Sequence, residues 1–158
     1  MNRKGFTLVE LLIVIAIIGI VAAIAIPNLL IALQKGKQKA TMGDLKTLGG
    51  AIESYITDWS FAPQVAAGVI TPLNVGWFSP FYIKILPTQD GWGTLFQYDR
   101  EALTNGVGGD LYSIYSFGRD KVTGVPTVQQ YDVASLADFN WDIYYSNGVF
   151  SVGPRTKK

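Results

Sequence analysis

A long and almost entirely apolar segment lies close to the start of the chain. The segment from Leu11 to Leu33 is about 23 residues long and contains no charged side chain. Because an α-helix rises 1.5 Å per residue, a segment of this length measures roughly 35 Å and can cross the hydrocarbon core of a bilayer with some tilt. The pattern therefore predicts a membrane-spanning helix close to the N-terminus.

The apolar pattern becomes amphipathic from Ala40 onward. The apolar residues that recur at spacings of three and four are Leu45, Leu48, Ile52, Tyr55, Ile56 and Trp59. Since these positions share one face of a helix, we expect a single helix from about Thr7 to Trp59 whose upper half supports a globular domain. Gly49 and Gly50 together cost roughly 2 kcal/mol of helix propensity relative to alanine, which suggests that another part of the domain approaches this helix closely.

The remainder shows the pattern of a loop-rich sheet. Pro63 ends the helix, and residues 64–88 have no sustained period, which indicates a long ordered connection with a short helix near residues 80–85. Strand-like segments follow at residues 94–98, 111–117, 142–146 and 149–152. Asn147-Gly148, between the last two segments, is a strong hairpin signal. The expected fold is α+β, with the long helix packed on a small antiparallel sheet of about four strands.

Composition narrows the chemistry that this chain supports. The sequence has 158 residues, a net charge of +1, no cysteine and no histidine. Disulfides, cysteine or histidine metal ligands, cysteine nucleophiles and histidine general bases are therefore excluded. Basic residues are sparse in the globular part and no phosphate-binding motif is present, so we expect no nucleic-acid binding and no nucleotide site.

One acidic residue stands at the start of the apolar segment. A carboxylate next to lipid is costly, so Glu10 marks a candidate functional site. Arg3 and Lys4 precede the span and a long polar segment follows it, which predicts a single pass with a cytoplasmic N-terminus; three lysines between residues 35 and 39 reduce this charge asymmetry. A cleaved secretory signal would have a shorter apolar core, and a plain signal anchor would not need Glu10.

The head of the chain resembles the class III signal of type IV pilins and type II secretion pseudopilins. The residues that carry the resemblance are Met1-Asn2-Arg3-Lys4-Gly5, Phe6-Thr7-Leu8-Val9-Glu10-Leu11-Leu12 and Ile26-Pro27-Asn28-Leu29. The resemblance implies that a prepilin peptidase cleaves between Gly5 and Phe6, that the new Phe6 amine is N-methylated, and that Glu10 acts in assembly. A carboxylate in the membrane needs a cation, and the Phe6 amine of a neighbouring subunit supplies one at a similar depth.

The resemblance also divides the chain into segments. It implies a leader peptide at residues 1–5, a membrane and filament-core helix at 6–34, an amphipathic helix at 35–59, and the loop-and-sheet part of the same globular domain at 60–158. Gly19 and Pro27 lie in the core helix, and Pro27 removes one backbone donor. One interpretation is a kink that neighbouring helices tolerate, whereas the resemblance implies that this segment loses helicity in the filament.

The body of the chain resembles the major pseudopilins of type II secretion systems. The matching segments are Leu86-Pro87, Asp90-Gly91-Trp92-Gly93 with Tyr98, Asp110-Leu111-Tyr112, Tyr115-Ser116-Phe117-Gly118-Arg119-Asp120 and Ala137-Asp138-Phe139-Asn140-Trp141. This chain has Gly91 where the family has proline and Lys121 where it has glycine, and a hairpin follows where the family usually stops. The resemblance implies a structural subunit, not an enzyme, of a periplasmic pseudopilus that drives protein secretion.

The resemblance further implies partners and a place in the cell. The partners are identical subunits in a helical filament, the prepilin peptidase, the inner-membrane assembly platform and minor pseudopilins. The chain would be anchored in the bacterial inner membrane with its globular domain in the periplasm. The main alternative is a major type IVa pilin of a surface pilus for adhesion or motility, with an extracellular domain. A further alternative is a membrane-tethered hydrolase with paired carboxylates such as Asp110 and Asp120, although their spacing singles out no acid and base.

The resemblance to the pseudopilins also implies a calcium ion that closes the loop over residues 116–141. Asp120 matches one acidic ligand and Asp138 the second, while Asp132 and Asp142 compete with Asp138 for that role. Carboxylates and backbone carbonyls are the ligands that calcium accepts. The alternative is structural, with Asp120 forming a turn after a strand and Asp138 capping another turn.

Overall fold

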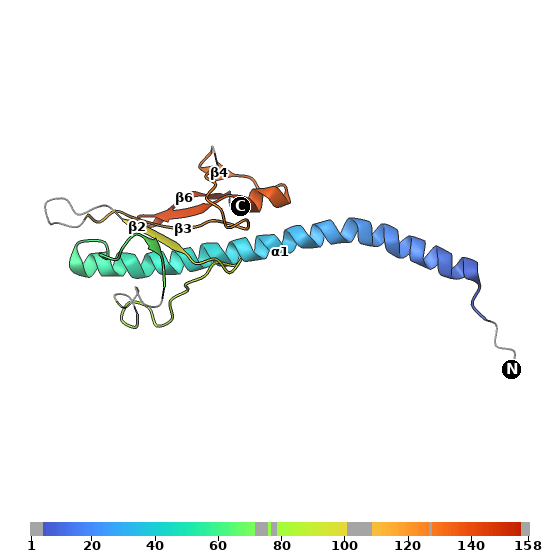
Figure 1. The fold of residues 1–158 in the computed structure, drawn as a ribbon, viewed down its shortest axis with the longest axis horizontal. Coiled ribbons are helices and arrows are strands. Elements are labelled where there is room, and N and C mark those ends of the chain that lie inside the picture. The colour runs from blue at the N-terminus through green and yellow to red at the C-terminus, as the bar shows by residue number, and fades with distance from the viewer. Residues whose placement is uncertain (1–4, 72–75, 77–78, 101–108, 127, 156–158) are drawn as a thin grey trace.

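The computed structural model describes residues 5–71, 76, 79–100, 109–126 and 128–155. One helix, α1 (Leu8–Trp59), runs along the length of the molecule, and the sheet and loops pack against its C-terminal half only (Figure 1). The N-terminal half extends away from the domain without any covering element (Figure 1). This arrangement confirms the expected α+β fold with a long N-terminal helix.

Helix α1 has a defined cap at each end. Thr7 is the N-cap, and its hydroxyl accepts a hydrogen bond from the Glu10 backbone N–H at 3.2 Å. Ser60 closes the other end in the left-handed conformation with φ of 62°, and its N–H donates to the Ile56 carbonyl at 2.7 Å. The helix therefore starts directly after Thr7 and ends at Trp59, in agreement with the apolar pattern.

Among the described residues, six strands form one sheet beside the helix. They are β1 (Gly68–Val69), β2 (Gln97–Arg100), β3 (Tyr112–Ser116), β4 (Gln130–Tyr131), β5 (Ile143–Ser146) and β6 (Val149–Pro154). Their order is β1-β2-β3-β5-β6-β4, and only the pair β4 and β6 is parallel. The expectation of about four strands missed β1 and β4, because a two-residue edge strand has no periodic pattern.

Two local expectations were wrong. The strand expected at residues 94–98 is β2, which begins later, because the Asp90 N–H donates to the Thr94 carbonyl at 2.8 Å and makes Thr94 part of a turn. The short helix expected near residues 80–85 is not formed, and those residues adopt turns and bends. In both places local hydrogen bonding and packing outweighed sequence propensity.

The hairpin expected at Asn147-Gly148 joins β5 and β6. Both residues adopt the left-handed conformation, with φ of 48° at Asn147 and 82° at Gly148, as a two-residue turn between twisted strands requires. The Asn147 side-chain carbonyl also accepts the Tyr112 backbone N–H at 2.9 Å, which ties the turn to the neighbouring strand. The hairpin prediction is therefore confirmed.

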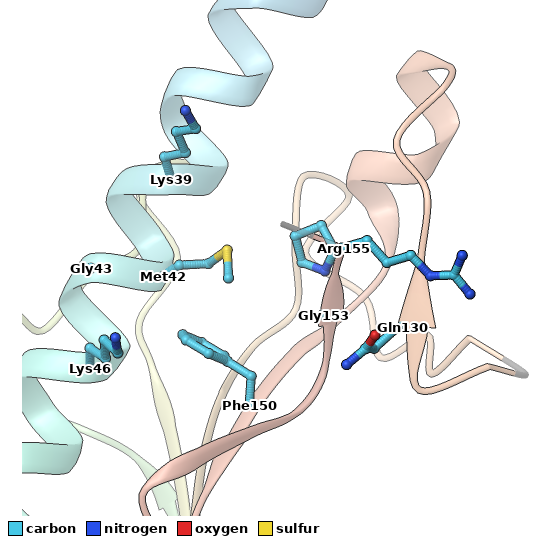
Figure 2. A pocket seen from close by; sticks show the side chains of 9 residues that line it. Lys39, Met42, Gly43, Lys46, Gln130, Phe150, Gly153 and Arg155 are labelled. Atoms are coloured by element: carbon cyan, nitrogen blue, oxygen red, sulfur yellow. The ribbon is translucent and has the colours of Figure 1, made fainter. Parts of the chain in front are cut away.

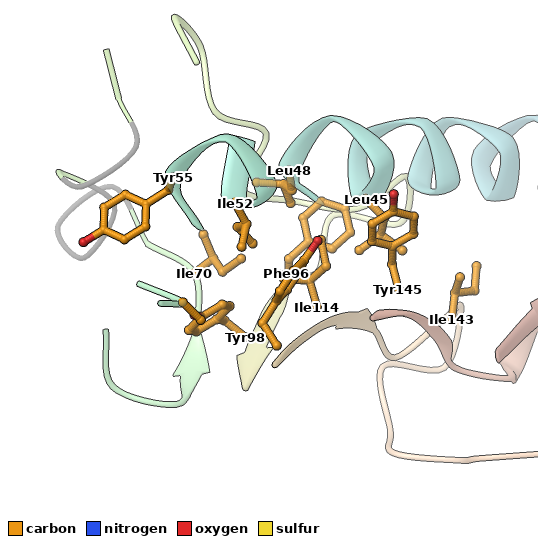
Figure 3. Packing of buried hydrophobic residues seen from close by; sticks show 12 residues of the cluster. Leu45, Leu48, Ile52, Tyr55, Ile70, Phe96, Tyr98, Ile114, Ile143 and Tyr145 are labelled. Atoms are coloured by element: carbon orange, nitrogen blue, oxygen red, sulfur yellow. The ribbon is translucent and has the colours of Figure 1, made fainter. Parts of the chain in front are cut away.

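The hydrophobic core lies between one face of α1 and the inner face of the sheet (Figure 3). The largest side chains that are completely buried are Leu45, Ile52, Phe96, Ile114, Ile143 and Phe139. Along β3 the buried and partly exposed positions alternate strictly, so Ile114 faces the helix while Ser113 and Tyr115 face outward. Complete burial of each large apolar side chain contributes roughly 1.5–3 kcal/mol, and this burial attaches the sheet to the helix.

The long connection over residues 64–88 packs onto this core. Ile70 is buried, and Val65, Tyr82 and Leu86 are partly buried against the core. The connection is therefore ordered where the structure describes it, as its apolar content predicts; residues 72–75 and 77–78 lie outside the described part.

The Asp90 carboxylate shapes the turn that precedes β2. Asp90 is buried, and its Oδ1 accepts the backbone N–H groups of Trp92 at 2.9 Å and Thr94 at 2.8 Å. Its Oδ2 accepts the Ser116 hydroxyl at 2.6 Å, from the end of β3. Charge-assisted bonds of this kind hold the turn and join it to the sheet.

The same turn attaches the domain to α1 just beyond its apolar part. The Trp92 indole N–H donates to the Gln34 side chain at 2.7 Å, and the Gly91 N–H donates to the Thr41 hydroxyl at 2.9 Å. A Cβ atom at Gly91 would overlap the Lys37 carbonyl of the helix. Glycine is therefore needed at position 91 because the turn lies directly on the helix backbone.

Replacing Gly49 with alanine is expected to destabilise the domain by roughly 1–3 kcal/mol. A Cβ atom there would overlap the Tyr145 ring. The Tyr145 hydroxyl donates to the Gly148 carbonyl at 2.8 Å, and the ring packs edge-on against Phe150 with 4.9 Å between the ring centroids, so the ring cannot easily move. Gly50→Ala is the matched control: nothing lies within 4 Å of its added Cβ, so it should stabilise the helix by about 0.5–1 kcal/mol. Thermal unfolding of both variants measures the difference, and equal shifts would contradict it.

Candidate functional site

The N-terminal end of α1 brings Phe6, Thr7 and Glu10 together. The Phe6 side chain is 79% exposed, and Glu10 is exposed beside it. The Glu10 carboxylate accepts hydrogen bonds from the Thr7 backbone N–H at 2.8 Å and from the Thr7 hydroxyl at 2.7 Å. Gly5 is exposed and precedes the helix, whereas the basic residues 3–4 lie outside the described part. The expected cleavage point is therefore accessible and not helical.

The bonds between Thr7 and Glu10 form a capping box. The spacing Thr-x-x-Glu ahead of an apolar run is a known signal for a capping box. The charge of Glu10 by itself does not point to Thr7, so Thr7 was not among the predicted site residues. Both donors bond to Oε2 of Glu10, which leaves Oε1 available to a cation from another chain. The carboxylate is thus held in one orientation by the first turn of its own helix.

The N-terminal half of α1 presents a long apolar surface. It includes an 18-residue stretch with a mean hydropathy of 3.1, and none of that stretch is buried. Glu10 is the one charged residue between Lys4 and Lys35. A surface of this kind must be covered by lipid or by other apolar helices.

Helix α1 continues through Gly19 and Pro27. Pro27 has no N–H to donate, and the Asn28 side-chain amide donates to the Ile24 carbonyl at 3.1 Å. The helix axis changes direction within the blue, N-terminal part of α1 (Figure 1), and a proline inside a helix is a common cause of such a bend. The backbone is therefore helical in the single subunit but has fewer hydrogen bonds at this point than elsewhere.

A second candidate site centres on the buried carboxylate of Asp142, directly before β5. Asp142 is completely buried; its Oδ2 accepts the Gly124 N–H at 3.1 Å, and its Oδ1 has no hydrogen-bond partner. Burial raises the pKa of Asp142 to about 6, and the charge of Asp120 adds to the rise while the hydrogen bond from Gly124 opposes it. An unpartnered buried carboxylate oxygen is costly unless a proton or a cation satisfies it.

Asp138, the residue matched to the second calcium ligand, lies in the short 3₁₀ helix η1 (Leu136–Asn140). Its Oδ2 accepts the backbone N–H groups of Ser135 at 2.6 Å and Ala134 at 2.9 Å, and the Ser135 hydroxyl at 3.0 Å. These hydrogen bonds hold the pKa of Asp138 below its usual range. Asp138 therefore caps its own turn, which is the structural alternative that the sequence left open.

The remaining two aspartates also occupy different settings. Asp120 is exposed, and its Oδ1 accepts the Val122 N–H at 3.1 Å. Its negative charge contributes to the raised pKa of Asp142. Asp132 lies 3.7 Å from Arg155 on the surface. In the described part of the chain no three acidic side chains gather in one place. The four candidate ligands are therefore dispersed, and Asp120 is the one whose charge contributes to the raised pKa of Asp142.

Two backbone carbonyls lie near Gly124, whose N–H donates to Asp142. A Cβ atom on Gly124 would lie 3.8 Å from the Val122 carbonyl oxygen and 4.0 Å from that of Asn140. Carboxylate and carbonyl oxygens are the donor types that calcium accepts, so the chemistry of Asp120, Asp142 and these carbonyls is compatible with that ion. A calcium ion held here would satisfy the free Oδ1 of Asp142 and compensate its buried charge.

The fold does not support the paired carboxylates of the hydrolase alternative. Asp110 precedes β3 and Asp120 follows it, so the two lie at opposite ends of a five-residue strand. A five-residue strand spans about 13 Å from its first to its last Cα atom, whereas an acid and a base that act on one bond lie within about 10 Å of each other.

Comparison with known proteins matches two segments of the chain to described families. The prokaryotic N-terminal methylation motif covers residues 1–26, and the family "Type II secretion system (T2SS), protein G" covers residues 28–135. Proteins named type II secretion system core protein G are similar over most of their length: that of Vibrio cholerae is 34% identical over 78% of this chain and 85% of its own. The Pseudomonas aeruginosa protein is 31% identical over 75% of this chain and 87% of its own length. The Escherichia coli protein is 31% identical over 78% of this chain and 86% of its own length.

Proposed function

Because this chain belongs to the protein G family of type II secretion systems, we propose that it is the major pseudopilin, the subunit that polymerises into the pseudopilus of such a system. The observation that carries the proposal is the N-terminal half of α1, which is apolar, unburied and marked by the single carboxylate of Glu10. The globular domain packs on the other half only, and so leaves this surface open to neighbouring subunits (Figure 1). That arrangement suits a structural subunit rather than an enzyme.

Processing prepares the subunit for assembly. A prepilin peptidase cleaves between Gly5 and Phe6, and N-methylation leaves the new Phe6 amine basic. The match to the methylation motif and the exposed position of both residues support this step. In the filament the Phe6 amine of one subunit pairs with Glu10 of a neighbour, so that each charge is compensated away from water.

The proposed location follows from the same half of the helix. The subunit is anchored in the bacterial inner membrane by a single pass with its N-terminus in the cytoplasm, and its globular domain stands in the periplasm. The exposed apolar stretch near the N-terminus supports the anchor. Its partners are identical subunits, the prepilin peptidase, the inner-membrane assembly platform and minor pseudopilins.

Filament growth is proposed to move folded substrates outward. The assembly platform must supply the energy, since the sequence contains no phosphate-binding motif. Inside the filament the segment around Gly19 and Pro27 loses helicity, which lets the fibre extend. The hydrogen bond missing at Pro27 supports this change, because fewer bonds have to break there.

We also propose that calcium binds beside Asp120 and Asp142, with Asp138 and Asp132 outside the site. The support is the free, buried Oδ1 of Asp142 among carboxylate and carbonyl oxygens. Bound calcium would supply charge compensation and would join the loop that contains Asp120 to the start of β5.

Deleting the gene in its host separates a pseudopilus from a surface pilus. We expect secretion of extracellular enzymes to fall at least tenfold, while surface pili and pilus-dependent motility stay normal. Re-expression of the intact gene should restore secretion. Normal secretion together with lost surface pili would instead identify a type IVa pilin.

A further inference from the structure

A groove lies between α1 and the C-terminal end of the sheet, close to the point where the apolar part of α1 ends. Two adjoining hollows of about 540 and 340 Å³ form it, and both are lined by Lys39, Met42, Pro154 and Arg155. The side chains of Met42 and Phe150 point toward one another from the two walls (Figure 2). The groove therefore combines an apolar interior with charged side chains at its rim.

The charge of the groove is positive. The charged side chains that line it are Lys35, Lys39, Lys46, Arg155 and Asp132. A carboxylate oxygen of Asp132 lies 3.7 Å from the guanidinium of Arg155. Among the described residues, no acidic group lies within ion-pairing distance of Lys35, Lys39 or Lys46. The lysines follow one another at steps of four and seven residues, so they form one stripe along α1.

The stripe starts where the membrane span ends. By the helical rise, Lys35 lies about 3 Å, Lys39 about 9 Å and Lys46 about 20 Å beyond Leu33, the last residue of the uncharged segment. The headgroup layer adds roughly 5–8 Å to each side of the hydrocarbon core. Lys35 and Lys39 therefore reach the lipid phosphates, and Arg155 lines the same hollows as Lys39, whereas Lys46 lies above the phosphates.

We propose that this basic groove binds the phosphate of anionic phospholipid headgroups and holds the unassembled subunit at the membrane surface; the proposal rests on the membrane-anchored subunit proposed above. Lys35 and Lys39 bind the phosphate, Arg155 adds positive charge at the rim of the groove, and Met42 and Phe150 contact the glycerol and upper acyl carbons. Each cation near an anionic surface strengthens binding roughly fivefold. Entry into a filament then requires the exchange of these lipid contacts for contacts with neighbouring subunits.

The absence of cysteine allows a direct test with the full-length chain. A Gln130→Cys variant carries one fluorophore at the exposed edge of the groove, in nanodiscs that contain nitroxide-headgroup phosphatidylglycerol or phosphatidylcholine. We expect the anionic lipid to quench at a mole fraction at least tenfold lower than the zwitterionic lipid does. The added changes Lys35→Gln and Lys39→Gln should together remove most of this selectivity.

Matched lysine variants test the position of the site. Lys84→Gln removes an exposed charge that does not line the groove and should leave the lipid selectivity unchanged. Lys46→Gln should lower the selectivity by less than twofold, because Lys46 lies above the phosphates. Equal quenching by the two lipids would overturn the proposal. So would an effect of Lys84→Gln as large as that of the double variant.

Two further outcomes would also overturn it. Relief of quenching by millimolar inorganic phosphate would show that free phosphate, not lipid, occupies the groove. Close approach of two labelled copies in phosphatidylcholine nanodiscs, lost in the Lys35 and Lys39 double variant, would identify the groove as a contact between subunits. None of these measurements requires filaments, so the lipid proposal and the pseudopilin proposal fail independently.

Discussion

Glu10→Val is expected to abolish filament assembly while the subunit still inserts into the membrane. The change leaves the Phe6 amine of a neighbouring subunit without its anion, and a buried charge that loses its partner costs roughly 3–5 kcal/mol. That cost lowers the subunit–filament association constant roughly a hundredfold to several thousandfold. Sheared-filament yield, measured against the membrane-bound pool of subunit, gives the result.

Glu10→Gln separates the charge of this residue from its role in the helix cap. Glutamine can still accept the Thr7 N–H and hydroxyl bonds that the carboxylate accepts at 2.8 and 2.7 Å, yet it carries no charge. We therefore expect Glu10→Gln to fail in assembly as Glu10→Val does. Filaments of normal yield from Glu10→Val would refute the pairing, and normal yield from Glu10→Gln alone would show that the cap, not the charge, is what assembly requires.

Asp142→Asn is expected to remove the effect of calcium on the unfolding of the domain. In the intact chain, calcium at a hundredfold excess over its dissociation constant should add about 2.7 kcal/mol to the unfolding free energy. Asparagine removes the carboxylate whose free Oδ1 would bind the ion. Asp138→Ala is the control: it loses its cap, with a cost of about 0.5–2 kcal/mol, but it should keep the calcium response. Thermal unfolding with calcium or with a chelator measures both.

The same residue predicts how pH acts on the chain without calcium. The pKa of Asp142 is about 6 in the folded chain, whereas an unfolded aspartate has a pKa of about 3.9. The folded chain therefore holds a proton that the unfolded chain releases, and the unfolding free energy should fall by up to about 3 kcal/mol as pH rises from about 4 to 6. Asp142→Asn should flatten this dependence. A calcium response that persists in Asp142→Asn would contradict the assignment of the site.

The sequence predicted the large elements of the fold because each has a long repeated pattern. Residues 11–33 are uncharged, the stripe from Leu45 to Trp59 keeps helical spacing, and Asn147-Gly148 suits only a tight turn. The two-residue strands β1 and β4 and the later start of β2 could not be predicted, since they depend on which backbone groups find partners in the folded domain.

The candidate calcium site shows the same division. The sequence contains four candidate aspartates, Asp120, Asp132, Asp138 and Asp142, and the resemblance to the pseudopilins favoured Asp120 and Asp138. In the fold, the Asp138 carboxylate accepts hydrogen bonds within its own turn, whereas Asp142 is buried and one of its carboxylate oxygens has no hydrogen-bond partner. Burial and hydrogen-bond competition are properties of the packed domain, so they could not be read from spacing.

At the N-terminus the sequence by itself determined the apolar surface of the helix and the charge at its start. A long apolar helix with one carboxylate at its start requires lipid or other helices around it and a cation near the carboxylate. This requirement follows from the cost of exposing apolar groups to water and of burying a charge, so it does not depend on tertiary contacts. Tertiary structure decided the rest. It docked the Asp90 turn on α1, buried Asp142 with one oxygen unpaired and brought Arg155 to the same groove as Lys39, since each of these depends on distances that only the folded chain defines.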